Sequence, residues 1–297
     1  MIKHWILTGD THGGMATVTR LGNIARNMLD EQKIVETAVI ILGDAGLNFY
    51  LNNTDKKYKK MINSMGFCVY CVRGNHEERP ENLGYDLDYD PEVKGLVYLD
   101  PNFENIKYLV DGEEYWFGEH SALVIGGAYS IDKWYRLARA GYMPEEAETA
   151  DPKKCGWFKD EQLTQKEMEA IGEKVLFKHY DFVLSHTCPY SWEPTDLFLN
   201  GIDQSQVDKS MEIWMDALKN CIDWSVWCFG HYHADRVERP CVEQFYHDYE
   251  DMETVWNRYY GEKTYKKEWW IPKSHYMEFW ENSEEGQKWL SSLSPLN

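Results

Sequence analysis

The sequence contains no apolar stretch long enough to cross a membrane, and residues 1–10 lack the apolar segment of a secretion signal. Basic residues are also scarce, because 31 Lys and Arg stand against 50 Asp and Glu and give a net charge of −19. Long nucleic acids and anionic membrane surfaces bind proteins mainly through Lys and Arg, so both are disfavoured as partners. We therefore expect a cytoplasmic protein with a small ligand. A phosphorylated ligand is compatible with this charge, since bound divalent metals reverse the local field.

The cysteines are few and irregularly spaced: the chain has seven, an odd number that does not indicate a disulfide framework. Cys68 and Cys71 have the spacing of a redox or zinc pair, but they lie in a strand-like run, where residues three apart face opposite sides. We therefore favour a structural role for both and a reducing compartment. Apolar residues, by contrast, make up 43% of the 297 residues, which is enough for the core of one large domain or two small ones.

Three apolar runs in the first part of the chain end on polar residues. Amphipathic patterns at residues 18–29 and 58–65 separate them, and such alternation of strands and helices is typical of a parallel sheet. In such sheets, ligands bind just beyond the carboxyl ends of the strands. The runs and the polar residues after them are 2–8 with Asp10 and His12, 39–42 with Asp44, and 67–72 with Asn75 and His76.

Two later strand-like runs end on histidine: residues 182–185 lead into His186, and residues 227–229 lead into Gly230, His231 and His233. In this order, the motifs resemble those of the calcineurin-like metallophosphoesterases, whose pattern is Asp-x-His, Gly-Asp, Gly-Asn-His-Asp/Glu, a lone His and Gly-His-x-His. The resemblance covers about residues 1–236. The histidines outside the motifs, which we interpret as ordinary surface or core residues, are His4, His120, His179, His247 and His275.

The resemblance implies an α/β fold in which two mixed β-sheets pack face to face and helices flank them, as a four-layer sandwich built from residues 1–236. It also implies two divalent transition-metal ions. Mn²⁺ is the first choice, with Fe or Zn²⁺ as alternatives, because the ligands mix carboxylate, amide and imidazole groups. Asp44 would bridge the ions, since one carboxylate can touch two metals about 3.5–4 Å apart. The implied ligands of the first ion are Asp10, His12 and His233, and those of the second are Asn75, His186 and His231.

The implied reaction is hydrolysis of a phosphomonoester or a phosphodiester by a water that the two ions activate. His76 resembles the family's catalytic histidine, which protonates the leaving oxygen or stabilises charge on it. The small partner expected from the net charge is then a phosphate ester or a nucleotide.

Positions 47 and 48 depart from the serine/threonine protein phosphatases, which the stretches around Asp10 and Asn75 otherwise resemble. Those enzymes carry a second Asp that orients the catalytic His, and then an Arg that grips phosphate; here the residues are Leu47 and Asn48. The second histidine of the last motif is typical of the diesterase and nuclease branches. We therefore expect a small or nucleotide-like ester. A nuclease, a protein phosphatase of the same superfamily and a non-catalytic scaffold with this fold remain as alternatives.

Two cations follow a strand predicted near residues 121–125: Lys133 and Arg136 are candidate contacts for the phosphate ester, and they equally fit solvated charges on a surface turn. The acidic, proline-containing stretch 144–154 is predicted to be a mobile loop. Apolar stripes predict two helices after it, with core faces at Leu163, Met168, Ile171 and Val175, and at Val207, Met211, Met215 and Leu218.

Residues 237–297 form an aromatic-rich C-terminal extension without recognisable chemistry. We expect it to pack on the core, while covering the site and forming an oligomer contact are the alternatives. Its tryptophans are Trp256, Trp269, Trp270, Trp280 and Trp289.

Overall fold

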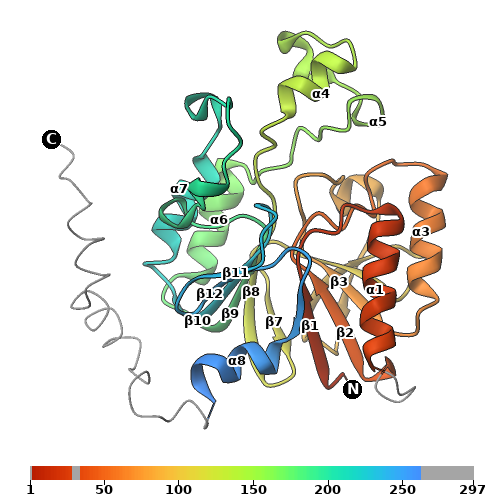
Figure 1. Ribbon diagram of the computed structural model, residues 1–297, viewed down its shortest axis with the longest axis vertical. Helices are drawn as coiled ribbons and strands as arrows, with labels where there is room; N and C mark the ends of the chain where they lie inside the picture. Colours follow the sequence, from red (N-terminus) through yellow and green to blue (C-terminus); the bar gives the residue numbers. More distant parts are fainter. Residues whose placement is uncertain (1, 29–33, 262–297) are drawn as a thin grey trace, which may run out of the picture. The chain divides into compact units, whose positions relative to one another are not determined.

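The computed structural model describes residues 2–28 and 34–261 and contains two mixed β-sheets with flanking helices (Figure 1). The chain divides into two compact units, Met1–Met252 and Glu253–Asn297, and both sheets belong to the first. The predicted α/β fold class is therefore confirmed. None of the helices in the described ranges combines the length and the apolar composition that a membrane span requires.

The seven-stranded sheet has the strand order β13-β1-β2-β3-β6-β5-β4. Its central strands β1, β2, β3 and β6 pair in parallel, so their carboxyl ends lie at one edge. Every residue of β2 is buried, as expected of a central parallel strand covered on both faces. The strands are β1 (His4–Thr8), β2 (Thr37–Ile41), β3 (Cys68–Cys71), β4 (Asp86–Asp90), β5 (Gly95–Leu99), β6 (Ile106–Leu109) and β13 (Tyr249–Asp251).

The six-stranded sheet has the order β11-β12-β10-β9-β8-β7. Strands β8, β9, β10 and β12 pair in parallel, and the two edge strands run antiparallel to their neighbours. The strands are β7 (Glu114–Phe117), β8 (His120–Ile125), β9 (His179–Ser185), β10 (Asp223–Phe229), β11 (Arg236–Arg239) and β12 (Val242–Gln244).

Aromatic side chains fill the space between the sheets. Trp5 of β1 lies with its ring centroid 5.5 Å from Tyr70 of β3 and 4.9 Å from Phe117 of β7. Because side chains alternate along a strand, Ile6 faces the other way and packs with Leu21 and other apolar residues of the helices outside the sheet. The predicted face-to-face arrangement of the sheets thus has an aromatic inner layer.

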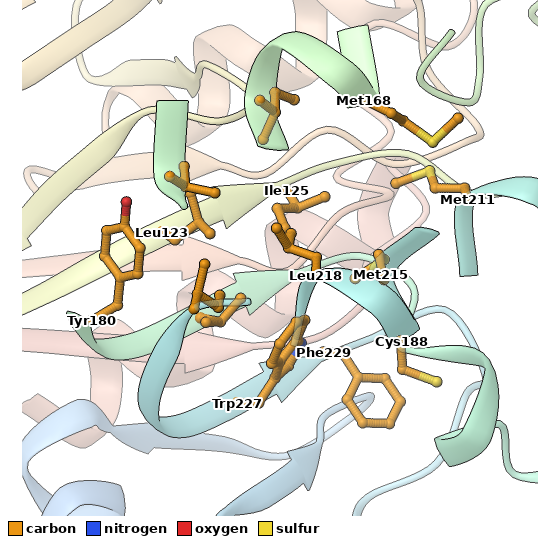
Figure 2. Packing of buried hydrophobic residues seen from close by; sticks show 14 of the residues in the cluster. Leu123, Ile125, Met168, Tyr180, Cys188, Met211, Met215, Leu218, Trp227 and Phe229 are labelled. Carbon is orange, nitrogen blue, oxygen red and sulfur yellow. The ribbon is translucent and has the colours of Figure 1, made fainter. Parts of the chain in front are cut away.

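Helices α1 and α3 cover the outer face of the seven-stranded sheet, and α6 and α7 cover that of the six-stranded sheet (Figure 1). Figure 2 shows Met168 of α6 and Met211 and Met215 of α7 packed near Ile125 and Trp227 of the strands. The α-helices are α1 (Gly14–Met28), α3 (Asn53–Asn63), α4 (Lys133–Arg139), α5 (Pro152–Cys155), α6 (Gln165–Val175), α7 (Ser210–Leu218) and α8 (Met252–Tyr260). The 3₁₀ helices are η1 (Pro80–Leu83), η2 (Pro144–Thr149), η3 (Tyr190–Trp192), η4 (Thr195–Leu197) and η5 (Gln204–Gln206).

The prediction of a loop at 144–154 is wrong, because η2 and α5 occupy most of this stretch. A small apolar cluster orders it: Ala147 and Cys155 are buried against Leu137 of α4 and Trp157. The prediction that Leu163 and Val207 lie within helices also needs correction. Both residues precede the first turn, and Leu163 is nevertheless buried in the predicted core.

The sheets extend past residue 236, since β11 and β12 complete one sheet and β13 pairs with β1 in the other. Trp256 lies on α8, where its ring stacks on Tyr260 with centroids 4.6 Å apart. The interpretations of Trp269, Trp270, Trp280 and Trp289 fall on residues outside the described ranges. All seven cysteines are described, and they form no disulfide.

The buried Glu212 of α7 makes stability depend on pH. Burial raises the pKa of Glu212 from 4.5 to about 7, although its Oε1 accepts a hydrogen bond from Thr187 Oγ1 at 2.9 Å. The folded state therefore binds the Glu212 proton more tightly than the unfolded state does. The stability that this proton contributes is fully present below pH 4.5 and is lost as the pH rises through about 7.

We expect Glu212→Gln to raise the free energy of unfolding at pH 8 by up to about 3 kcal/mol and to change it little at pH 5, since glutamine has no proton to lose. Urea unfolding of the chelator-treated protein at both pH values measures this. The matched control is Glu169→Gln at an exposed position of α6, which should be neutral at both. An equal effect of Glu212→Gln at pH 5 and pH 8 would contradict the titration.

Candidate metal centre

The motif residues meet where parallel strands end. Asp10 and His12 follow β1, and Asp44 follows the neighbouring strand β2. The backbone N–H groups of Thr11 and His12 donate hydrogen bonds to the carbonyl oxygen of Asp44, at 3.2 and 2.8 Å. The loops after β1 and β2 are thus joined directly, which fixes the Asp10, His12 and Asp44 side chains at one edge of the sheet.

Glycines let the other motifs approach these carboxylates. A Cβ at Gly74, which precedes Asn75, would lie 2.0 Å from Asp44 Oδ1. A Cβ at Gly230, which precedes His231, would lie 2.3 Å from Asp10 Oδ1. Both distances are impossible for a real side chain, so glycine at these positions is a condition for closing the cluster.

Four candidate ligands occupy backbone conformations that L-residues rarely adopt. The φ angles are +53° at His12, +49° at Asp44, +68° at His231 and +56° at His233. Such strain persists only when the surroundings over-determine it, and it concentrates at functional sites. The strand-end loops therefore hold these side chains in place at a cost in backbone energy.

Two groups of ligand atoms lie close enough to share an ion. The first comprises Asp10, His12 and His233, and the second comprises Asp10, Asp44 and His186, with the atoms of each group within 4.8 Å of one another. In the first group, His233 Nε2 lies 3.3 Å from Asp10 Oδ2. Asp10 belongs to both groups, so the two positions are adjacent.

Asp44 faces both groups as well. Its Oδ2 lies 3.7 Å from His12 Nδ1, and its Oδ1 lies 3.6 Å from His186 Nε2. Asn75 completes this side, because its Oδ1 lies 2.8 Å from His186 Nε2. The Nδ1 atom of His186 lies 2.9 Å from the carbonyl oxygen of Leu42, and this contact sets the tautomer that leaves Nε2 directed at the cluster.

The donor set fits divalent metal ions. His12 Nε2 and His233 Nε2 face each other at 2.8 Å, and His186 Nε2 faces Asn75 Oδ1 at the same distance. In each pair, two electron-donating atoms point at each other. A cation bound between them would accept both lone pairs. Carboxylate, amide and imidazole donors together suit Mn²⁺, Fe or Zn²⁺.

The ionisation states fit a cation too. Burial raises the pKa of Asp44, but His76, His186 and His12 outweigh it and hold the pKa below its usual range. Burial likewise raises the pKa of Asp10, and His186 and His233 overcome it, so the net shift is downward. Burial lowers the pKa of His231 to about 3, which keeps its imidazole neutral at physiological pH. His231 lies beside His186, with ring centroids 5.0 Å apart.

A buried chain of hydrogen bonds orients the Asn75 amide. Asn75 Nδ2 donates to Ser130 Oγ at 2.8 Å, and the Ser130 hydroxyl donates to Glu161 Oε2. Because the amide nitrogen is held by Ser130, the amide oxygen is the atom that faces His186. Sequence reasoning missed Ser130 and Glu161; the only signal was that Ser130 follows the predicted strand ending at residue 125.

We expect Ser130→Ala to weaken binding of a metal ion beside Asn75 by about 10- to 100-fold, because the Asn75 amide loses the partner that fixes its orientation. Metal titration of the chelator-treated protein measures the affinity. The matched control is Ser121→Ala in β8, whose buried hydroxyl bonds Asp181 at 3.0 Å, away from the cluster. Unchanged affinity in Ser130→Ala, or an equal loss in both variants, would refute the role of Ser130.

His76 lies beside the cluster and is held by its backbone. Its N–H donates to Asp44 Oδ1 at 2.8 Å, and its Nε2 lies 4.0 Å from Asp44 Oδ2. In the described part of the chain, His76 Nδ1 and Asp132 Oδ1 are buried without a hydrogen-bond partner. Burial lowers the pKa of His76, and although the charge of Asp44 raises it, the net shift is downward. Arg136 and Asp132, which form an ion pair at 2.7 Å, act on this pKa in opposite directions.

Leu47 and Asn48, the residues at which the chain differs from the protein phosphatases, both have structural roles. Leu47 is fully buried in the apolar cluster beneath α1 and α3. Asn48 is also buried, and its Oδ1 accepts hydrogen bonds from Lys59 Nζ at 2.6 Å and from Tyr85 Oη at 2.9 Å. The side chain of Asn48 is therefore committed to this polar cluster, and neither residue replaces the contacts of a protein phosphatase.

The candidate substrate cations differ in their surroundings. Lys133 Nζ lies 4.2 Å from the centroid of the Trp157 ring, in a cation–π contact. Arg136 donates from Nε to Asp132 Oδ2 at 2.7 Å and from Nη1 to the carbonyl oxygen of Gly156 at 3.0 Å. Arg136 and Asp132 both act electrostatically on His76. Arg136 therefore lies on the side of the cluster where His76 stands, while the ammonium group of Lys133 rests on an aromatic ring.

The two sheets and the strand-end cluster define an α/β metallophosphoesterase sandwich with candidate metal-binding groups. The model of the family described as calcineurin-like phosphoesterase matches residues 5–235, and the chain belongs to this family. A search of curated proteins finds no match for the chain. The resemblance of the sequence motifs to those of the calcineurin-like metallophosphoesterases is thus confirmed.

Proposed function

We propose that this chain is a dinuclear metal-dependent phosphoesterase that hydrolyses a phosphomonoester or phosphodiester of a small or nucleotide-like molecule. The observation that carries the proposal is the position of Asp44, which turns one carboxylate oxygen toward His12 and the other toward His186. A carboxylate shared by two cations requires this arrangement. Membership of the family supports the reaction class.

The chain's residues would hold two ions, with Mn²⁺ as the first choice and Fe or Zn²⁺ as alternatives. When bound, the ions neutralise phosphate oxygens and lower the pKa of water. The chain contributes a preorganised donor set, so little reorganisation is needed when charge develops on the phosphate. The proposed ligands are Asp10, His12 and His233 for one ion, Asn75, His186 and His231 for the other, and Asp44 for both.

His76 is the proposed general acid. Its Nε2 is the ring nitrogen turned toward the centre, 3.3 Å from Asn75 Nδ2 and 4.0 Å from Asp44 Oδ2. A proton on this nitrogen can pass to the leaving oxygen as the ester bond breaks. Burial lowers the pKa of His76, and the charge of Asp44 opposes that shift, so Asp44 favours the protonated ring.

The substrate is proposed to be a small or nucleotide ester rather than a phosphoprotein, because no guanidinium occupies position 48 and Asn48 is buried among Lys59 and Tyr85. A planar guanidinium fork matters most for a monoester dianion. Arg73, from the motif that resembles protein phosphatases, is likewise occupied, since it bonds Asp111 at 2.9 Å and the carbonyl oxygen of Glu161 at 2.7 Å.

We expect the Mn²⁺-loaded protein to hydrolyse aryl diesters or nucleotide esters with kcat/KM at least comparable with that for phosphopeptides. A panel of aryl monoesters, aryl diesters, cyclic nucleotides, single-stranded DNA and phosphopeptides at matched concentration measures this. Phosphopeptide hydrolysis about tenfold better than the rest, a difference of roughly 1.4 kcal/mol in transition-state binding, would overturn the substrate assignment. Full metal content without hydrolysis of any member would favour the non-catalytic scaffold.

A further inference from the structure

A cavity of about 640 Å³ lies between the segment after Asn48 and the helices α4 and α5. Figure 1 shows these helices beyond the carboxyl ends of the strands, on the side where the candidate metal centre lies. The volume falls in the range of pockets that hold small-molecule ligands. The family's motif residues do not line it, so the cavity is distinct from the metal centre.

The lining of the cavity is cationic, although the chain carries a net charge of −19. Its acidic residue, Asp132, is already paired with Arg136 at 2.7 Å. Within the described ranges, no ion pair involves the other lining cations, which are exposed on α4 and α5: Arg139, Lys153 and Lys154. Cations that line a cavity without a salt-bridge partner favour a bound anion.

Aromatic rings form another part of the lining. Tyr50 is 45% exposed and Tyr135 is 65% exposed, and both line the cavity. Phe49 supports Tyr50 edge to face with centroids 5.0 Å apart, and it lies 6.0 Å from the Arg136 guanidinium. Exposed tyrosine rings beside cations are suited to stack a nucleobase next to a phosphate.

The cavity lies beside the segment that carries His76. The backbone N–H of Glu78 donates a hydrogen bond to the carbonyl oxygen of Asn48 at 3.0 Å, and Phe49 and Tyr50, which follow Asn48, line the cavity. Gly156 packs closely against two other lining residues, because a Cβ there would lie 3.1 Å from the Phe49 ring and 3.3 Å from Arg136 Nη1. A substrate with its scissile phosphate at the metal centre would thus extend past His76 into the cavity.

We propose that this cavity binds the base and the second phosphate of a nucleotide that carries two phosphate groups, with Arg139, Lys153 and Lys154 around the phosphate and Tyr50 or Tyr135 against the base. The placement of the first phosphate at the metal centre rests on the proposed function. A second phosphate accounts for the unpaired cations, and a base accounts for the exposed rings.

The first test is binding to the chelator-treated protein, which needs no catalysis. The probes are adenosine 5′-phosphate, adenosine and inorganic pyrophosphate in isothermal titration. We expect adenosine 5′-phosphate to bind about tenfold more tightly than either of the others, and to lose about tenfold in affinity in Lys153→Ala/Lys154→Ala. The matched control is Lys56→Ala/Lys60→Ala, two exposed lysines one turn apart on α3, which should bind like the wild type.

The second test is turnover by the Mn²⁺-loaded protein. We expect kcat/KM for adenosine 3′,5′-bisphosphate to exceed that for adenosine 5′-phosphate by about tenfold, with the advantage carried in KM and removed in Lys153→Ala/Lys154→Ala. Bis-nitrophenyl phosphate, which has neither base nor second phosphate, should react equally well with the wild type and the variant.

Failure of this inference differs from failure of the proposed function. Equal binding of adenosine and adenosine 5′-phosphate, or an unchanged affinity in Lys153→Ala/Lys154→Ala, would overturn the anion pocket even if aryl esters are hydrolysed. Binding of pyrophosphate as tight as that of the nucleotide would overturn the assignment of the base. Loss of binding in the variant without any esterase activity would support the pocket and refute the phosphoesterase.

Discussion

Replacing Asp44 by Asn should reduce the metal content of the protein from the proposed two ions per chain to one or fewer and lower kcat by about 10³-fold. The substitution keeps the shape of the side chain and removes its negative charge. Two cations held close together then lose the anion between them, and breaking such a buried charge pair costs about 3–5 kcal/mol. Elemental analysis after Mn²⁺ loading gives the stoichiometry, and an aryl diester gives kcat.

The control for Asp44→Asn is Asp90→Asn. Asp90 is also buried and ion-paired, with Lys107 Nζ at 2.6 Å, but it lies on β4, away from the strand-end cluster. Its substitution should lower the free energy of unfolding and leave two ions bound. If Asp44→Asn retains two ions and wild-type kcat, Asp44 does not bridge a dinuclear site.

Replacing His76 by Ala should lower kcat by about 10²–10⁴-fold and leave the metal content unchanged, because the proposed general acid is lost and the proposed metal ligands remain. The loss should shrink for nitrophenyl esters, whose leaving oxygen needs no proton, and be full for alkyl esters. Comparing kcat for the two kinds of ester in the wild type and the variant measures this dependence.

The control for His76→Ala is His179→Ala, an exposed histidine that pairs with Asp223 at 2.7 Å. It should change neither kcat nor the metal content. An equal loss on nitrophenyl and alkyl esters in His76→Ala would assign His76 to substrate positioning and remove the proton transfer from the proposal.

Position 47 carries no carboxylate, and the charges that act on His76 come from elsewhere in the chain. Where protein phosphatases place an Asp two residues after a Gly-Asp-x motif, this chain has the buried Leu47, and the ion pair of Asp132 and Arg136 acts on the pKa of His76 in opposite directions. The sequence shows the departure but not this ion pair, because residues 76 and 132 are far apart in the chain.

The fold class and the motif residues could be predicted because the information is local. Each motif follows an apolar run directly, and a parallel sheet brings the ends of such runs to one edge, so Asp10 and Asp44 had to lie close together once β1 and β2 were paired. The sequence also gives the chemical type of each candidate metal ligand directly. Convergence of the candidate ligands was therefore predictable without coordinates.

The residues that orient the metal ligands could not be predicted from the sequence, since they lie far from those ligands in the chain. Ser130 lies 55 residues from Asn75, which it orients, and Glu161 lies 31 residues from Ser130. The stretch 144–154 has the composition of a loop, yet the burial of Ala147 and Cys155 orders it into η2 and α5. Apolar contacts with Leu137 and Trp157 outweigh the local preference.

The sequence by itself determined the family, the donor types and their place at strand ends, because strand periodicity and motif spacing are properties of neighbouring residues. The tertiary structure alone decided that Asn48 serves a polar cluster, that Asp132 stands near His76 and that Lys153 and Lys154 line a cationic cavity. These facts depend on which side chains share a small volume. Burial and charge in that volume are set by the whole fold.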